Sequence, residues 1–161
     1  MSFKRFPLHL LVLLGVLSGC STRWSDKERE TYRRKCSETK TFNDELFLFK
    51  GFDNSEFDSI VVQEYNNAVL LDSFKMHVRP AENPLDVENK MRSGSTDRFF
   101  NVNYQYHFLI PGQKPFILAN MKMVMWSQFT MFSEGYGCVM GDYTIDGIHF
   151  EHDGNPTFKK R

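Results

Sequence analysis

The chain has 161 residues, of which 20 are basic and 20 acidic, so its formal net charge is zero. This balance excludes the strong basic excess that marks most nucleic-acid and acidic-lipid binding proteins. Hydrophobic residues make up 41% of the chain and 16 residues are Phe, which indicates one globular domain with an aromatic core.

Residues 1–19 have the layout of a secretory signal. Lys4 and Arg5 form a positive start, an apolar run extends to Leu17, and small residues precede Cys20. The run is shorter than the ~20 apolar residues that a membrane-spanning helix needs. We expect this segment to be removed. Removal takes two of the 20 basic residues and leaves 18 against 20 acidic ones, a formal charge of −2.

The residues Leu17-Ser18-Gly19-Cys20 resemble the lipobox of bacterial lipoproteins. The resemblance implies that Cys20 becomes the first residue of the mature protein, carries diacylglycerol on its thiol and is acylated, for example with palmitate, on its amine. Two or three acyl chains hold a protein stably at a membrane, whereas one chain binds only marginally. Ser21 in place of Asp resembles lipoproteins sorted to the outer membrane.

Three cysteines occur in the chain. If lipid occupies Cys20, then Cys36 and Cys138 remain as an even pair in an oxidising compartment, where disulfides persist. Closing a loop of about 100 residues contributes up to ~4.7 kcal/mol in the chain-entropy model. We predict a Cys36–Cys138 disulfide, and the alternative is two buried free thiols.

A capping box at 25–28 predicts a helix from Asp26 to about Cys36, because Ser25 and Glu28 each satisfy a backbone N–H of the other. The helix surface is mostly charged, and only Tyr32 and Cys36 share an inward face. Such a helix is marginal alone, so we expect it to dock through Cys36.

From Phe42 onward the hydrophobic pattern becomes that of strands, with extended segments predicted at 45–50, 59–64 and 69–78. In the last segment three apolar residues alternate with three basic ones: Phe74, Met76 and Val78 with Lys75, His77 and Arg79. This alternation favours an antiparallel sheet with one solvated face.

A polar segment at 79–98 separates these strands from the next group. Asn83 as N-cap, Pro84 at the first helical position and Gly94 as terminator predict a short helix that continues through 88–92. We expect this segment to be mobile or to contact a partner.

Further strands are predicted at 103–110, 116–126, 139–145 and 148–152. Asp146-Gly147 joins the last two as a type I′ turn, since both positions tolerate positive φ. A Gly-rich irregular stretch is expected at 133–137 and a frayed tail at 159–161.

About seven or eight strands without alternating helices predict a mainly β fold: an antiparallel β-sandwich, immunoglobulin-like or transthyretin-like, after a short N-terminal helix. A small closed barrel is the alternative. The expected parts are a signal peptide at 1–19, a lipidated tether and short helix at 20–41, and a single β-sandwich domain at 42–161. The body of the chain also loosely resembles small envelope lipoproteins of Gram-negative bacteria, on the basis of Tyr104-Gln105-Tyr106 in one strand and Tyr143-Thr144-Ile145-Asp146-Gly147 near the end. This resemblance carries no catalytic motif.

Met121, Met123 and Met125 alternate along one predicted strand and would project from a single face. Their soft thioethers suit Cu(I). Methionine also fills irregular space in ordinary cores, and we favour that interpretation for so apolar a strand.

The remaining candidate ligands and nucleophiles give weaker signals. A group at 149–153 contains His149, Glu151, His152 and Asp153, but neighbouring strand residues point to opposite faces, so we expect a solvated strand end. No Gly-x-Ser-x-Gly elbow occurs, and 135–137 lacks the third glycine of a dinucleotide fingerprint.

Aromatic side chains offer one more hypothesis, a groove for a hydrophobic ligand or an unpaired strand. The candidates are Tyr104, Tyr106, Phe108, Phe116, Trp126, Phe129 and Phe132. We favour a core position for most of them.

Together these features favour a membrane-anchored envelope lipoprotein with a non-enzymatic binding or structural role. Its expected partners are the membrane, through the N-terminal lipid, and another envelope protein, with no nucleic acid and no cofactor. The alternatives are a periplasmic binder of copper or of a small hydrophobic ligand, and an enzyme of unrecognised type.

Overall fold

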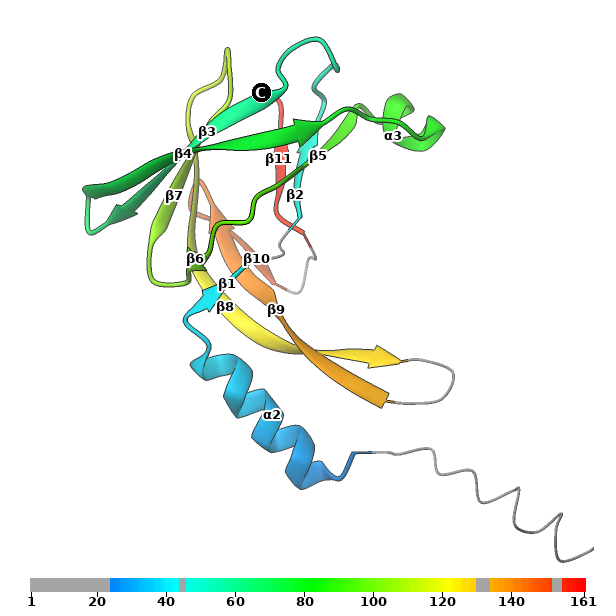
Figure 1. Ribbon diagram of the computed structural model, residues 1–161, viewed down its shortest axis with the longest axis vertical. Coiled ribbons are helices and arrows are strands. Elements are labelled where there is room, and N and C mark those ends of the chain that lie inside the picture. The colour runs from blue at the N-terminus through cyan, green and yellow to red at the C-terminus, as the bar shows by residue number, and fades with distance from the viewer. Residues whose placement is uncertain (1–23, 44–45, 130–133, 152–154) are drawn as a thin grey trace, which may run out of the picture.

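The structure, a computed structural model, describes residues 24–43, 46–129, 134–151 and 155–161. The fold is mainly β with a short N-terminal helix, as the sequence predicts (Figure 1). With the labels of Figure 1, the elements are α2 Asp26–Glu38, β1 Thr41–Phe42, β2 Phe47–Lys50, β3 Ser59–Asn66, β4 Val69–Arg79, α3 Pro84–Glu88, β5 Met91–Ser95, β6 Phe100–Asn101, β7 Gln105–Leu109, β8 Phe116–Phe129, β9 Glu134–Ile145, β10 Ile148–Glu151 and β11 Thr157–Lys159.

Among the described residues, nine strands form one mixed sheet in the order β10-β9-β8-β7-β3-β4-β5-β2-β11, and β1 pairs separately with β6. The large sheet curls, so that its two halves face each other across the core (Figure 1). The predicted sandwich-like class is confirmed, and the two walls are halves of a single sheet rather than two separate sheets.

Helix α2 begins at the predicted capping box. The Ser25 hydroxyl accepts a hydrogen bond from the Glu28 N–H at 3.3 Å, and the Glu28 carboxylate accepts one from the Ser25 N–H at 2.7 Å. The bonds from Ser25 lower the pKa of Glu28. The helix extends slightly beyond its predicted end, buries Cys36 and packs against β8 and β9.

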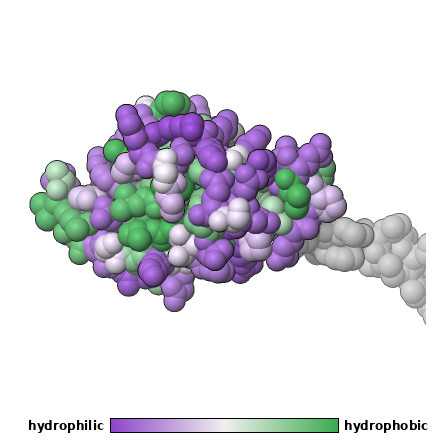
Figure 2. Space-filling view, turned by 90° about the horizontal axis from the view of Figure 1, so that it is seen from above, coloured by the Kyte–Doolittle hydropathy of each residue, from purple (hydrophilic) through white to green (hydrophobic). Residues whose placement is uncertain are grey.

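The β3–β4 hairpin projects from the body at the left of Figure 1. Asn67 and Ala68 form its turn with φ of 47° and 68°. Just beyond the turn, Val69, Leu70 and Leu71 are exposed, and Figure 2 shows an apolar end on that side of the molecule. Deeper along β4 the alternation is as predicted, because Met76 and Val78 are buried while the alternating basic residues Lys75, His77 and Arg79 are exposed.

The predicted helix after Asn83 is shorter than expected. The Asn83 side chain accepts a hydrogen bond from the Asp86 N–H at 2.8 Å, which confirms the N-cap, but α3 ends at Glu88. The prediction of Gly94 as terminator was wrong, since Gly94 lies within β5. A Cβ there would lie 2.9 Å from the Phe49 ring, so close strand packing requires the glycine.

Arg92, placed in that helix by the sequence pattern, is a buried residue of β5 with 1% exposure. Its guanidinium donates to the carbonyl oxygens of Asp53 and Val78 at 3.3 and 3.4 Å and lies over the Phe57 ring at 4.6 Å. Burial lowers its pKa. Arg92 thus connects the β2–β3 loop to β4.

Two further predictions were wrong near the C-terminus. The stretch expected to be irregular belongs to β9 from Glu134 onward, with Gly137 opposite Trp126 in the ladder, although residue 133 lies outside the described part. Of the tail expected to fray, Lys159 is the last residue of β11, which pairs in parallel with β2, and the Lys160 N–H donates to the Lys50 carbonyl oxygen at 2.9 Å. The Asp146-Gly147 turn is confirmed, with φ of 54° and 81°.

The chain end connects the β11 edge of the sheet to two distant turns. The Arg161 N–H donates to the side chain of Gln113 at 3.0 Å, and the Arg161 guanidinium pairs with Asp146. One turn precedes β8 and the other precedes β10, so this contact holds one end of the curled sheet together.

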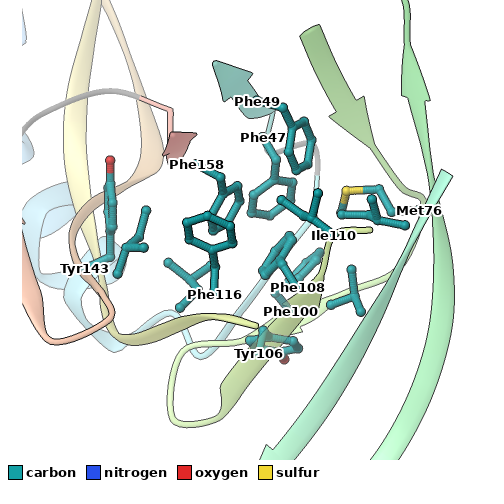
Figure 3. Packing of buried hydrophobic residues seen from close by; sticks show 14 of the residues in the cluster. Phe47, Phe49, Met76, Phe100, Tyr106, Phe108, Ile110, Phe116, Tyr143 and Phe158 are labelled. Atoms are coloured by element: carbon teal, nitrogen blue, oxygen red, sulfur yellow. The ribbon is translucent and has the colours of Figure 1, made fainter. Parts of the chain in front are cut away.

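Phenylalanine side chains fill the space between the two walls (Figure 3). The Phe158 ring from β11 lies 4.3 Å from Phe108 and 5.5 Å from Phe49 between ring centroids, and all three side chains are fully buried. The Tyr106 hydroxyl accepts a hydrogen bond from the Asn101 N–H at 2.6 Å, and burial raises the pKa of Tyr106.

Candidate ligand-binding cleft

An open cleft of about 710 Å³ lies between the end of α2, the β6–β7 connection, the β3–β4 turn and β8. Its volume is within the usual range for small-molecule sites. We name it the α2–β8 cleft. It is lined by Ser37, Thr39, Lys40, Asn67, Val102, Asn103, Tyr104, Gln105, Ala119, Asn120, Met121, Lys122, Met123 and Val124.

The cleft has buried apolar lining residues and an exposed polar rim. Val102, Ala119, Met121 and Met123 are between 4% and 8% exposed. The amides and lysines that line the cleft are all exposed, and Tyr104 is half-buried. A ligand here would therefore meet apolar carbon and sulfur at the floor and hydrogen-bonding groups at the edge.

A β-bulge shapes the β8 side of the cleft. Ala119 pairs with Thr144 and Lys122 with Asp142, so two residues of β8 stand opposite one residue of β9. Asn120 has φ of +54°, a left-handed conformation that Asn adopts more readily than most residues. Its side-chain amide donates to the Thr144 hydroxyl at 3.2 Å, which in turn donates to the Ala119 carbonyl at 3.1 Å.

Several polar side chains of the cleft are free to meet a ligand. Within the part of the chain that the structure describes, the side chains of Lys40, Asn67, Asn103, Gln105 and Lys122 make no hydrogen bond or ion pair. The described lining contains both of these lysines and no acidic residue. The cleft therefore presents two lysine side chains beside neutral amides, and Asp142, the cross-strand neighbour of Lys122, is outside its lining.

The three methionines of the copper hypothesis do not all reach this cleft. Met121 and Met123 line it, whereas Met125 is half-buried, stands opposite Cys138 in the ladder and is outside the lining. Met123 also borders a second, smaller pocket of about 330 Å³ with Cys138. Two of the three methionines thus line one cleft, and Cu(I) binding by the set stays a prediction.

The aromatic candidates are divided between the cleft and the core. Tyr104 lines the cleft, whereas Tyr106, Phe108 and Phe116 are buried in the core. Trp126 is 52% exposed on β8. The Phe129 side chain and all of Phe132 lie outside what the structure describes.

The disulfide that fixes α2 is present as predicted. Cys36 and Cys138 are bonded, with their Cα atoms 5.2 Å apart. Near the other end of α2, the Trp24 ring lies 5.5 Å from Tyr32 and 5.0 Å from Tyr136 of β9, measured between centroids. One covalent and one aromatic contact therefore hold the helix against the β8–β9 hairpin. Cys20 lies outside the described residues.

No metal-binding group of three or more His, Cys, Asp or Glu side chains occurs among the described residues. Of the group at 149–153, His149 and Glu151 are exposed on β10, while His152 and Asp153 lie outside the described part. In residues 24–43, 46–129, 134–151 and 155–161, no helix has the length and apolarity to cross a bilayer.

Sequence reasoning selected Met121, Met123 and Tyr104 but missed the polar rim. Lys40, Asn67 and Gln105 lie in different elements, and nothing in their local sequence joins them. One signal was available: Asn120 interrupts an apolar strand, and Asn is depleted in strands unless the backbone departs from them. Comparison of the chain with family models, with curated proteins and with solved structures gave no match in any of the three.

Proposed function

We propose that the protein is an envelope lipoprotein, anchored by lipid at Cys20, with a non-enzymatic binding role. The observation that carries the proposal is the state of the cysteines. Cys36 and Cys138 are joined to each other, so the third cysteine is the one that ends the lipobox-like sequence at 17–20. Diacylglycerol on that thiol, together with amine acylation, supplies the two or more chains that stable anchoring requires.

The fold provides a physical link between such an anchor and the cleft. Residues 21–25 lead from Cys20 into α2, a helix of 13 residues, which is about 20 Å long. The disulfide joins the last part of this helix to β9. Ser37, at the same end, lines the α2–β8 cleft. A lipid-anchored helix attached in this way holds the cleft about one helix length from the tether.

Replacement of the lipidated residue tests the proposal. In a Gram-negative host fed an alkyne analogue of palmitate, Cys20→Ser should lose the label and move from the membrane to the soluble fraction, because serine has no thiol to carry the diacylglycerol and no acyl chain then anchors the protein. The Cys36→Ser, Cys138→Ser double variant is the matched control and should keep the label. A Cys20→Ser protein that stays labelled and membrane-bound would contradict the anchor.

Copper binding is a second candidate, which the two thioethers in the cleft favour. Wild-type protein should then compete for Cu(I) with a chromogenic chelator, and Met123→Leu should compete less while its unfolding midpoint changes little, since Leu and Met have similar volumes. Wild-type protein that takes up no Cu(I) would exclude this candidate.

A further inference from the structure

We infer that the α2–β8 cleft binds an acidic saccharide, a hydroxyl-rich ring that carries a carboxylate or a phosphate. The inference rests on the proposed binding role and names its ligand class. Neutral sugars, cations and fatty acids are the competing ligand classes, and the lining residues distinguish among them.

Charge selects an anionic ligand. Lys40 follows α2 and Lys122 lies on β8, and both ammonium groups are exposed and unpaired within the described structure. Asp142, which stands opposite Lys122 in the ladder, is outside the lining. Two positive charges with no acid among the described lining residues repel a cationic ligand and attract an anionic one, whose contacts with Lys would be charge-assisted hydrogen bonds.

The amides select a ligand with hydroxyl groups. Asn67, Asn103 and Gln105 reach the rim from the β3–β4 turn, the β6–β7 connection and the start of β7. A carboxamide donates through its nitrogen and accepts through its oxygen, which matches hydroxyls that do both. A fatty acid would make no use of these exposed amides, and any amide that its chain covered would lose water without gaining a hydrogen bond, which costs free energy.

The floor suits the C–H face of a sugar ring. Tyr104 is half-buried in the lining, and Met121, which is 4% exposed, also lines the cleft. An aromatic ring with a thioether provides an apolar surface of limited area, which a pyranose can cover with its C–H bonds while its hydroxyls face the rim. A purely inorganic anion would make no use of this surface.

Calorimetric titration of the full lipidated protein in a non-ionic detergent tests the inference. The probes are trigalacturonic acid, glucose 6-phosphate and maltotriose, which present a carboxylate, a phosphate and no charge. Binding of one or both acidic probes at least tenfold tighter than maltotriose supports the inference and identifies the anionic group. Equal binding of acidic and neutral probes, or no binding of any probe, would overturn it.

Matched lysine variants locate the binding. Lys40→Ala with Lys122→Ala should weaken binding of the acidic probe at least tenfold, whereas Lys75→Ala with Lys114→Ala removes the same charge at exposed positions outside the cleft and should change it less than twofold. Equal losses in the two pairs would overturn the assignment. The exposed positions leave the fold intact, which the thermal unfolding midpoint verifies.

The palmitate label separates this inference from the anchor. Wild-type protein that carries no label but binds an acidic saccharide contradicts the anchor alone. Labelled protein that binds no acidic saccharide contradicts the ligand class alone.

Discussion

The aromatic core and the α2–β8–β9 arm, meaning α2 with the outer halves of the two long strands, are stabilised by different interactions. In the core, phenylalanines from β2, β7 and β11 are completely buried. In the arm, α2 buries only Cys36, and residues 135–139 of β9 are half-buried. Because an isolated two-stranded ribbon is marginally stable in water, a disulfide and aromatic contacts in the arm supply what burial supplies in the core.

The largest expected effect comes from the core. Phe158→Ala should lower the free energy of unfolding by about 3–5 kcal/mol, the usual cost of removing a buried aromatic ring, as measured by urea denaturation. Phe99→Ala, at a position 65% exposed, is the matched control and should change stability by no more than about 0.5 kcal/mol. A similarly small loss for Phe158→Ala would mean that β11 contributes little to the core.

Loss of the disulfide should separate the two regions. The Cys36→Ser, Cys138→Ser double variant should lose about 2–5 kcal/mol of stability, because the unfolded chain regains the freedom that the cross-link removes. Hydrogen exchange should show that the amides of α2 lose more protection than those of β3 and β7, whose protection falls only with the global stability. Unchanged protection across α2 would show that Trp24 and Tyr136 hold the helix without covalent help.

A smaller effect should follow from Gly141→Ala, where β9 packs on β8. A Cβ at this position would lie 2.2 Å from a methyl carbon of Val124, and such overpacking costs about 1–3 kcal/mol. The double variant Gly141→Ala, Val124→Ala should recover most of the loss, as measured by the unfolding midpoint. If the second substitution adds a further loss instead, the proposed clash is not the cause.

The smallest effect concerns pH. Burial lowers the pKa of His107 in β7, whose ring lies 4.3 Å from Tyr65 between centroids. The folded state then binds a proton at His107 less readily than the unfolded state. The free energy of unfolding that depends on neutral His107 is therefore complete above about pH 6.5 and is lost as the pH falls through the lowered pKa. His107→Gln should reduce the dependence of the free energy of unfolding on pH between pH 7 and 5. His77→Gln is the matched variant. An unchanged slope would remove His107 as the source.

The sequence alone determined the features that depend on neighbouring residues. The capping box at Ser25, the Asp146-Gly147 turn and the alternation along β4 are local, because backbone hydrogen bonds and strand pleat act over a few positions. Counting cysteines also paired Cys36 with Cys138, since lipid was expected to occupy the third.

Tertiary structure decided what depends on residues far apart in the chain. The three residues of β11 are too few for a pattern, and they form a strand because Phe158 enters the space beside Phe49 and Phe108. A glycine is needed at position 94 within β5 because a Cβ there would lie 2.9 Å from the Phe49 ring of β2. The same holds for the cleft: its methionines could be selected from the sequence, but its charge and hydrogen-bonding groups meet only because the sheet curls and α2 docks against it.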